Sequence, residues 1–215
     1  MEASFRFVEG AQVTFEDLWF KVGGNYTALT LWNESAITCK QVYFEITTPT
    51  NSEFFIYMDT HSKMTLDGVG MKVPEKHQSV IGMSASELSI RNSTIFSKID
   101  LSEGSKLTLE NVHIEIFGNN TIHAKDSEVI AKNSTITGGD LEKDFPPVWL
   151  RNVIWESENC KIELPTGTGV CLDNNVQFNS DSDRITSINS FNSMIRAHQA
   201  TFTEFLCVYE ESFAS

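Results

Sequence analysis

The sequence predicts an all-β fold, a right-handed parallel β-helix of about nine three-strand coils that takes up residues 1–215 as one domain. Three observations predict it. A motif of the form apolar-x-apolar-x-Asn recurs along the whole chain. Each copy lies between two further segments that alternate apolar and polar residues, as strands with one buried face do. The outward positions of successive copies also alternate in charge.

The central segment of the repeat recurs at intervals of about 23 residues, which is typical of a solenoid. Its first and third positions are apolar in every copy, so they are expected to point into a common core. The copies begin at Val13, Ile37, Met64, Leu88, Leu107, Val129, Val148, Val170 and Ile195.

The fifth position of the repeat indicates a corner of the coil. Asn tolerates left-handed backbone angles, and stacked amides hydrogen-bond along a column. We therefore expect an inward ladder of corner side chains, and the residues are Asp17, Gln41, Gly68, Asn92, Asn111, Asn133, Asn152, Asn174 and Gln199.

Two more strands complete each coil. The strand after the corner is predicted to bury one aromatic or aliphatic position per coil: Phe20, Phe44, Met71, Ile95, Ile114, Ile136, Trp155 and Phe202. In the eighth coil one inserted residue at Asn174 and Asn175 is expected to bury Val176 and Phe178 there instead. The strand before the repeat is predicted from seven apolar pairs: Phe5 and Phe7, Leu29 and Leu31, Ile56 and Met58, Ile81 and Met83, Ile99 and Leu101, Ile122 and Ala124, Ile162 and Leu164. The usual hand of parallel crossovers makes the solenoid right-handed.

Charges at the fourth position support this register. The column is expected to read Glu16, Lys40, Asp67, Arg91, Glu110, Lys132, Arg151, Asp173 and His198, mostly with opposite signs side by side. Lateral charge pairs of this kind are each worth only about 0.2 to 1 kcal/mol, so they mainly select which coil lies beside which.

The corner repeat resembles that of the pectin-lyase-like right-handed β-helix superfamily along the whole chain. Two segments show it well, Leu107-Thr-Leu-Glu-Asn111 and Val129-Ile-Ala-Lys-Asn133. That superfamily includes polysaccharide lyases and hydrolases, phage tailspikes, and adhesin and autotransporter passengers. The resemblance implies the fold and leaves the activity open.

Composition removes several classes of function. The formal charge of −13 repels phosphate backbones and anionic lipid, so we expect neither nucleic acid nor a membrane as partner. No apolar run is long enough for a spanning helix, and the first residues do not show the pattern expected of a signal peptide. Cys39, Cys160, Cys171 and Cys207 lack metal-ligand spacing. We expect Cys39 in the core, and a disulfide between Cys160 and Cys171 stays open.

The ends and loops complete the expected organisation. Nothing at either end resembles the helical caps of such solenoids, so we expect either a segment of a longer protein or capping by Phe5, Phe205, Tyr209 and Phe213. Loops after the last strand of each coil are expected along one edge, where solenoids commonly bind. They are 23–27, 47–52, 74–78, 117–120, 138–147, 156–159 and 179–183.

One candidate site combines an acid with a base. Asp100 and His123 are expected side by side in the outward column of the first strands, with Glu163 in the same column and Lys98 and Lys125 flanking it. The pair has acid–base geometry in principle, although a surface ion pair is the commoner outcome. The resembling lyases and hydrolases use carboxylate clusters, and none is expected on the regular strands.

A second candidate site consists of outward aromatic residues. Trp19 and Tyr43 hold the same outward position in the first two coils, which favours a binding platform for a sugar ring or a protein. The alternative is that loops cover them. Trp149 is expected in a second apolar column between Ile130 and Cys171.

Three further patterns carry little weight. The outward hydroxyl column that begins at Thr14 and Thr38 lacks the second flat column of an ice-binding face. The carboxylates at 140, 142 and 144 lack the glycine and terminal Glu of a calcium loop. Sequons occur at Asn25, Asn33, Asn92, Asn119 and Asn133, of which two fall in the expected inward ladder.

The sequence thus favours a non-catalytic binding or adhesin module, extracellular or at a cell surface, that presents loops, Trp19, Tyr43 and Trp149 to a protein or glycan. The alternative is a polysaccharide lyase or hydrolase that uses Asp100 and His123. No cofactor or metal is expected, and the oligomeric state stays open.

Overall fold

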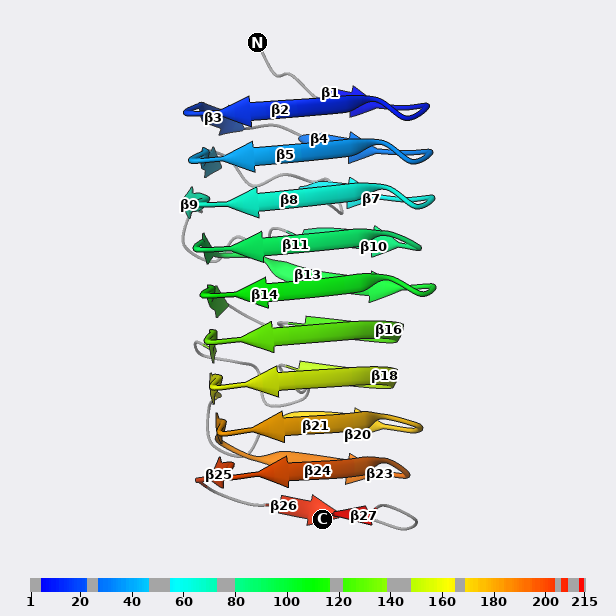
Figure 1. Ribbon diagram of the computed structural model, residues 1–215, viewed down its shortest axis with the longest axis vertical. Helices are drawn as coiled ribbons and strands as arrows, with labels where there is room; N and C mark the ends of the chain where they lie inside the picture. The colour runs from blue at the N-terminus through cyan, green and yellow to red at the C-terminus, as the bar shows by residue number, and fades with distance from the viewer. Residues whose placement is uncertain are drawn as a thin grey trace.

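The computed structural model is an all-β, right-handed parallel solenoid with its coils stacked along one axis (Figure 1). It describes residues 5–22, 27–46, 55–72, 80–116, 122–138, 148–164, 169–203, 206–208 and 213–214. Every strand pairing among these residues is parallel. The predicted fold class is therefore confirmed.

Each coil contributes one strand to each of three rows, which we call the first-, second- and third-strand rows. The first-strand row consists of β1 (Phe5–Phe7), β4 (Leu29–Leu31), β7 (Ile56–Met58), β10 (Val80–Ser84), β13 (Lys98–Ser102), the start of β16 (Ile122–Lys132), the start of β18 (Val148–Glu158), β20 (Val170–Asp173), β23 (Ile188–Phe191) and β26 (Leu206–Val208). The second-strand row consists of β2 (Gln12–Glu16), β5 (Ala36–Lys40), β8 (Lys63–Asp67), β11 (Glu87–Arg91), β14 (Lys106–Glu110), the ends of β16 and β18, β21 (Gln177–Asp181), β24 (Met194–His198) and β27 (Phe213–Ala214). Because β16 and β18 run through the corner, these two rows form one sheet.

The third-strand row forms a separate sheet with nine described strands, seen at the left of Figure 1. They are β3 (Trp19–Val22), β6 (Tyr43–Ile46), β9 (Gly70–Lys72), β12 (Thr94–Ile95), β15 (His113–Ile116), β17 (Thr135–Gly138), β19 (Lys161–Glu163), β22 (Arg184–Ile185) and β25 (Thr201–Phe202).

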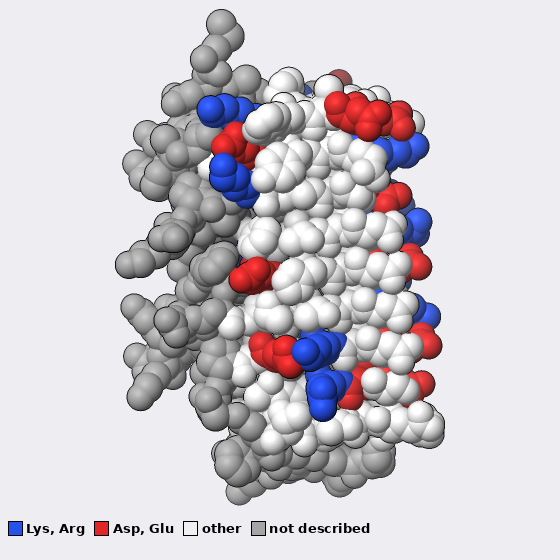
Figure 2. Space-filling model, turned by 90° about the vertical axis from the view of Figure 1, so that its left-hand side faces the viewer, with Lys and Arg blue, Asp and Glu red and all other residues white. Residues whose placement is uncertain are grey.

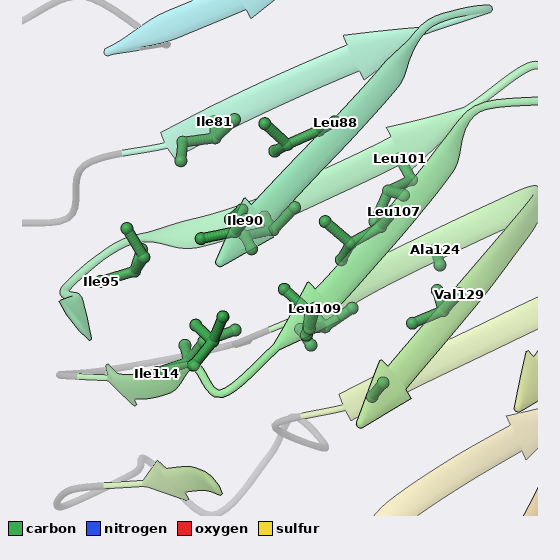
Figure 3. Close-up of a cluster of buried hydrophobic side chains, with 14 of the residues drawn as sticks. Ile81, Leu88, Ile90, Ile95, Leu101, Leu107, Leu109, Ile114, Ala124 and Val129 are labelled. Carbon is green, nitrogen blue, oxygen red and sulfur yellow. The ribbon is translucent and has the colours of Figure 1, made fainter. Parts of the chain in front are cut away.

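The core is a single column of apolar side chains from all three rows. Figure 3 shows a middle section, in which Leu88 and Ile90 face Ile81 and Ile95 across the coil and stack on Leu107 and Leu109 of the next one. Buried side chains alternate with outward ones in β11, β14 and the second half of β16, as the period of two requires. Cys39 lies in this core, as predicted.

The predicted register holds from β1 to β17 and is one strand off in the two copies that begin at Val148 and Val170. The last copy, with Ile195 and Ala197 in β24 and Phe202 in β25, again lies in the predicted rows. Val148 and Leu150 pair with Ile122 and Ala124, so they belong to the first-strand row. Val170 and Leu172 stack on them in the same row. The second-strand row continues instead through Trp155 and Phe178, which pair with Val129 and with each other.

Several neighbouring predictions were wrong for the same reason. Ile162 pairs with Ile136 in the third-strand row, and Glu163 lies there too, outside the column of Asp100. Arg151 lies beside Lys125 at the first corner, and the charge column at the second corner continues with Glu158 and Asp181. Residues 156–159 and 179–183, expected as loops, are strand and corner. The other expected loops lie mostly outside the described residues.

The cause of the shift is that each coil has two corners with the same requirement. Both place a residue at positive φ, for example Asn111 (55°) and Asn133 (48°) at the second corner and Asn152 (51°) at the first. Asn satisfies that requirement at either corner. The motif apolar-x-apolar-x-Asn therefore ends a first strand at Asn152 and a second strand at Asn133.

The corner amides form the predicted ladders, but on the outside of the turn. Asn111 Nδ2 donates to Asn92 Oδ1 at 3.3 Å, and Asn92 Nδ2 donates to Asp67 Oδ1 at 2.9 Å. Asn92, Asn111 and Asn133 are exposed. The expected inward placement was wrong because positive φ turns the Cβ away from the core, and the residue after the corner points inward in its place.

That inward corner position holds small or polar side chains that complete buried backbone hydrogen bonds. Val69 N–H donates to Ser93 Oγ at 2.9 Å, and Val112 N–H donates to Ser134 Oγ at 3.1 Å. Asp183, only 2% exposed, takes the same position one coil below Cys160, whose N–H donates to its Oδ1 at 2.7 Å. A buried donor without such a partner costs about 1–3 kcal/mol, so these side chains are structural.

We expect Asn111→Leu to lower the free energy of unfolding by about 1–2 kcal/mol, because Leu tolerates positive φ poorly and removes an amide hydrogen bond. Glu110→Ala should cost less than about 0.5 kcal/mol, since its ion pair with Arg91 is exposed. Denaturant titration of both variants checks this. Asn111→Gly, which keeps the backbone angle and loses only the amide, should fall between them; equal stability of all three would contradict the corner assignment.

Candidate functional site

The outward face of the third-strand row carries the most exposed aromatic side chain among the described residues. Trp19 of β3 is 70% exposed, and Tyr43 of β6 lies beside it in register at 39%. Their ring centroids are 5.9 Å apart and their planes meet at 84°, an edge-to-face contact. The predicted side-by-side placement of the two rings is thus confirmed. Both rings are accessible to solvent, because no described residue covers them.

The ring of Tyr43 lies over Gly70 of β9, which is the next residue in the same outward column. A Cβ at Gly70 would lie 2.9 Å from Tyr43 Cδ2, closer than ordinary van der Waals contact. The absence of a side chain at this position therefore lets the tyrosine ring settle against the sheet. Trp19 in turn packs against the ring of Tyr43, so the orientation of both aromatics depends on the glycine.

An ion pair forms the polar side of the same surface. Lys72 Nζ lies 3.1 Å from Glu45 Oε1, and both residues occupy the neighbouring outward column. Together Trp19, Tyr43, Glu45 and Lys72 line an open depression of about 460 Å³, which we call the Trp19 depression. Figure 2 shows this face of the solenoid, where charged side chains are sparse compared with the alternating charges along its right-hand edge.

A second polar and aromatic cluster lies on the outward face of the first-strand row. Asp100 and His123 are in register, with His123 Nδ1 3.2 Å from Asp100 Oδ1. Lys98 Nζ lies 3.0 Å from Asp100 Oδ2. Trp149 follows His123 in the column, with ring centroids 4.6 Å apart. Trp149 was expected beside Ile130, but Ile130 pairs with Glu156 because of the register shift.

The electrostatics of this cluster favour an ionised carboxylate. Burial opposes ionisation of Asp100, but His123 and the Lys98 ammonium outweigh it, so the pKa of Asp100 lies below its usual value. Asp100 Oδ1 is buried without a well-aligned hydrogen bond among the described residues. The carboxylate therefore lies between His123 and Lys98, with 3.2 Å from its Oδ1 to His123 Nδ1 and 3.0 Å from its Oδ2 to Lys98 Nζ.

The three cysteines with described side chains are poor nucleophiles in this fold. Cys39, Cys160 and Cys171 are free thiols, so the disulfide left open between Cys160 and Cys171 does not form. Burial raises the pKa of Cys39 to about 12 and that of Cys160 to about 11, and it also raises the pKa of Cys171. Protonated thiols are unreactive at neutral pH. The Cys207 side chain lies outside the described residues.

No group of three or more His, Cys, Asp or Glu side chains within the described ranges is placed to share a metal ion. The carboxylates at 140, 142 and 144 lie outside those ranges, as do the side chains of Phe205, Tyr209 and Phe213. Of the residues expected to cap the solenoid, Phe5 is described, and it packs against Phe7, Phe15 and Phe20.

The charge of Asp100 should make stability depend on pH in the acid range. Its lowered pKa means that the stabilisation is complete above the unfolded value of about 3.9 and is lost as the pH falls through the folded value. The melting temperature of the wild-type protein should therefore fall more between pH 5 and pH 3 than that of Asp100→Asn. Parallel melting curves for the two proteins over this range would show that the cluster adds no net stabilisation.

Comparison of this chain with models of protein families, with curated proteins and with solved structures gave no match.

Proposed function

We propose that this protein is a non-catalytic binding module and that the Trp19 depression recognises an uncharged sugar ring of a glycan. The observation that carries the proposal is the 70% exposure of Trp19 beside Tyr43. Leaving that much apolar surface in water forgoes on the order of 3 kcal/mol of transfer free energy. A ligand that covers the indole would recover part of it.

The chemistry of the depression fits a sugar. A pyranose ring offers an apolar C–H face to an aromatic ring and hydroxyl groups at its edge. Tyr43 and Trp19 supply two rings at a right angle, and Glu45 and Lys72 supply acceptors and donors within the same hollow. Ligand sites typically combine apolar walls with a few polar groups in this way.

The charge of the protein argues against an acidic glycan. The pair Glu45–Lys72 is neutral as a unit, and the chain as a whole carries −13. A polyanion such as an acidic polysaccharide would be repelled during approach. We therefore propose a neutral glycan as the ligand.

We also propose a superfamily and a location for this protein. The parallel β-helix supports membership of the pectin-lyase-like superfamily, in an adhesin- or passenger-like role at a cell surface or outside the cell. The exposed sequons Asn33, Asn92 and Asn133 are compatible with that location. Within the described residues, no helix has the length and apolarity to cross a membrane.

A polysaccharide-cleaving enzyme is the second candidate, favoured by the 3.2 Å approach of His123 to Asp100. It ranks lower because Lys98 already neutralises the carboxylate and Trp149 covers one face of the imidazole. Incubation with acidic oligosaccharides, followed by ultraviolet absorbance, would detect lyase turnover. Turnover lost in Asp100→Ala or His123→Ala would reverse the ranking.

We expect the double variant Trp19→Ser, Tyr43→Ser to lose at least tenfold in affinity for neutral oligosaccharides identified on a glycan array, measured by calorimetry. Its melting temperature should barely change, because both side chains lie on the outer face. Trp32→Ser is the matched control, since Trp32 is 39% exposed at the first corner, outside β3 and β6. Unchanged affinity in the double variant would refute the site, and a drop of 2 kcal/mol or more in stability would return the two rings to a structural role.

Gly70→Ala tests whether the ring orientation matters. The φ of Gly70 is not positive, so Ala is compatible with the backbone, and the added methyl group displaces the ring of Tyr43. Sugar affinity should fall several-fold with little loss of stability. If Gly70→Ala binds the sugar as tightly as the wild type while the double variant binds it weakly, the rings do not need the orientation that Gly70 permits.

A further inference from the structure

A second depression lies on the outward face of the second-strand row, over β18, β21 and β24. It has a volume of about 500 Å³, and its outer walls are formed by Glu156, Asn179 and Arg196, with Asp181 and His198 along one side. These strands are at the lower front of Figure 1, on a different face from the Trp19 depression. We call it the Glu156–Arg196 depression.

Several opposite charges elsewhere on this row are paired from coil to coil. Lys63 bridges to Glu87 at 3.1 Å, and Lys106 bridges to Glu128 at 2.8 Å. At the second corner Arg91 lies 3.4 Å from Glu110, and Lys132 lies 3.0 Å from Glu158. Opposite charges on adjacent strands meet directly because the strands are only about 4.8 Å apart.

The pairing stops in the depression. Glu156 pairs in register with Asn179, and Asn179 pairs with Arg196, so an uncharged residue separates the two charges. Two strand spacings place their backbones about 10 Å apart. In the described part of the chain, neither the Glu156 carboxylate nor the Arg196 guanidinium has an ion-pair partner, and His198 next to Arg196 has none either.

We propose that this depression binds a small zwitterion that carries an ammonium and a carboxylate group. The ammonium group pairs with Glu156, and the carboxylate pairs with Arg196, with His198 as a further donor. A ligand whose ammonium and carboxylate groups lie a few ångströms apart is suited to bridge two side chains that extend from strands two spacings apart. Short amino acids have that separation between nitrogen and carboxylate.

The mixed lining selects against other ligand classes. A simple anion would be attracted by Arg196 and repelled by Glu156 and Asp181, and a simple cation would meet the reverse. A sugar would lack the large aromatic ring on which it commonly stacks, because no described Phe, Tyr or Trp side chain lines the hollow. Only a ligand with both charges pairs with both ends.

The floor of the depression is held rigidly from inside. Ser157 and Ser180 line it and both donate hydrogen bonds to the buried carboxylate of Asp183. Ser157 Oγ also accepts from Trp155 Nε1 at 2.9 Å. This network spans β18 and β21, so the strands that carry Glu156 and Asn179 are fixed relative to each other before a ligand arrives, which lowers the entropic cost of binding.

The test uses glycine, β-alanine and γ-aminobutyrate as a series of increasing span, with butyrate and butylammonium as probes that carry one charge. Ligand-observed NMR on the full chain should show that the best zwitterion binds at least tenfold more tightly than either single-charge probe. Arg196→Gln and Glu156→Gln should each remove that advantage. Lys63→Gln, a charge change on the same row outside the depression, should leave it unchanged.

The variant Asn179→Lys provides a second, independent test of the proposal. A lysine between Glu156 and Arg196 restores the alternation of the row, pairs with Glu156 and occupies the hollow, so it should abolish zwitterion binding while the melting temperature is kept. The proposal is overturned if none of the three zwitterions binds at millimolar concentration, if the single-charge probes bind equally well, or if folded variants at positions 156 and 196 bind like the wild type.

Discussion

The left-handed corner is the constraint on which this solenoid depends. Each coil must turn twice within a few residues, and both turns use residues at positive φ such as Asn111 and Asn152. The backbone N–H of the corner residue donates to the coil below, for example from Asn111 to Lys132 O at 3.1 Å. Because the corner sets where each strand begins, it also sets the in-register stacking of the core and of the outward columns.

The inward residue after each corner links the turns to the core. Serines at this position satisfy backbone donors of the adjacent coil, and Asp183 extends the same role into a network with Ser157, Ser180 and Cys160 N–H. A carboxylate buried in the core is costly unless it is fully hydrogen-bonded. The network therefore connects the strands beneath the Glu156–Arg196 depression, which would favour the binding proposed there.

Both candidate sites arise where a column of the regular solenoid is interrupted. Gly70 interrupts an outward column and lets Tyr43 and Trp19 take up their right-angled arrangement. Asn179 interrupts a charge ladder and leaves Glu156 and Arg196 apart. Several charges of the regular columns pair with neighbours from adjacent coils, as Lys63 does with Glu87 and Lys106 with Glu128. At these two interruptions we propose that ligands bind.

The sequence by itself determined the fold class, the period, the core positions up to Val129 and Ala131, and the neighbours Trp19 with Tyr43 and Asp100 with His123, because each follows from alternation within one strand and a constant step between coils. Only the tertiary structure decided the register between residues 148 and 181, since Asn serves either corner and the motif at Val148 does not say which strand it ends. The Glu156–Arg196 depression depends on that register, so sequence reasoning missed it. Strand pairing across coils is a long-range choice, and local pattern does not make it.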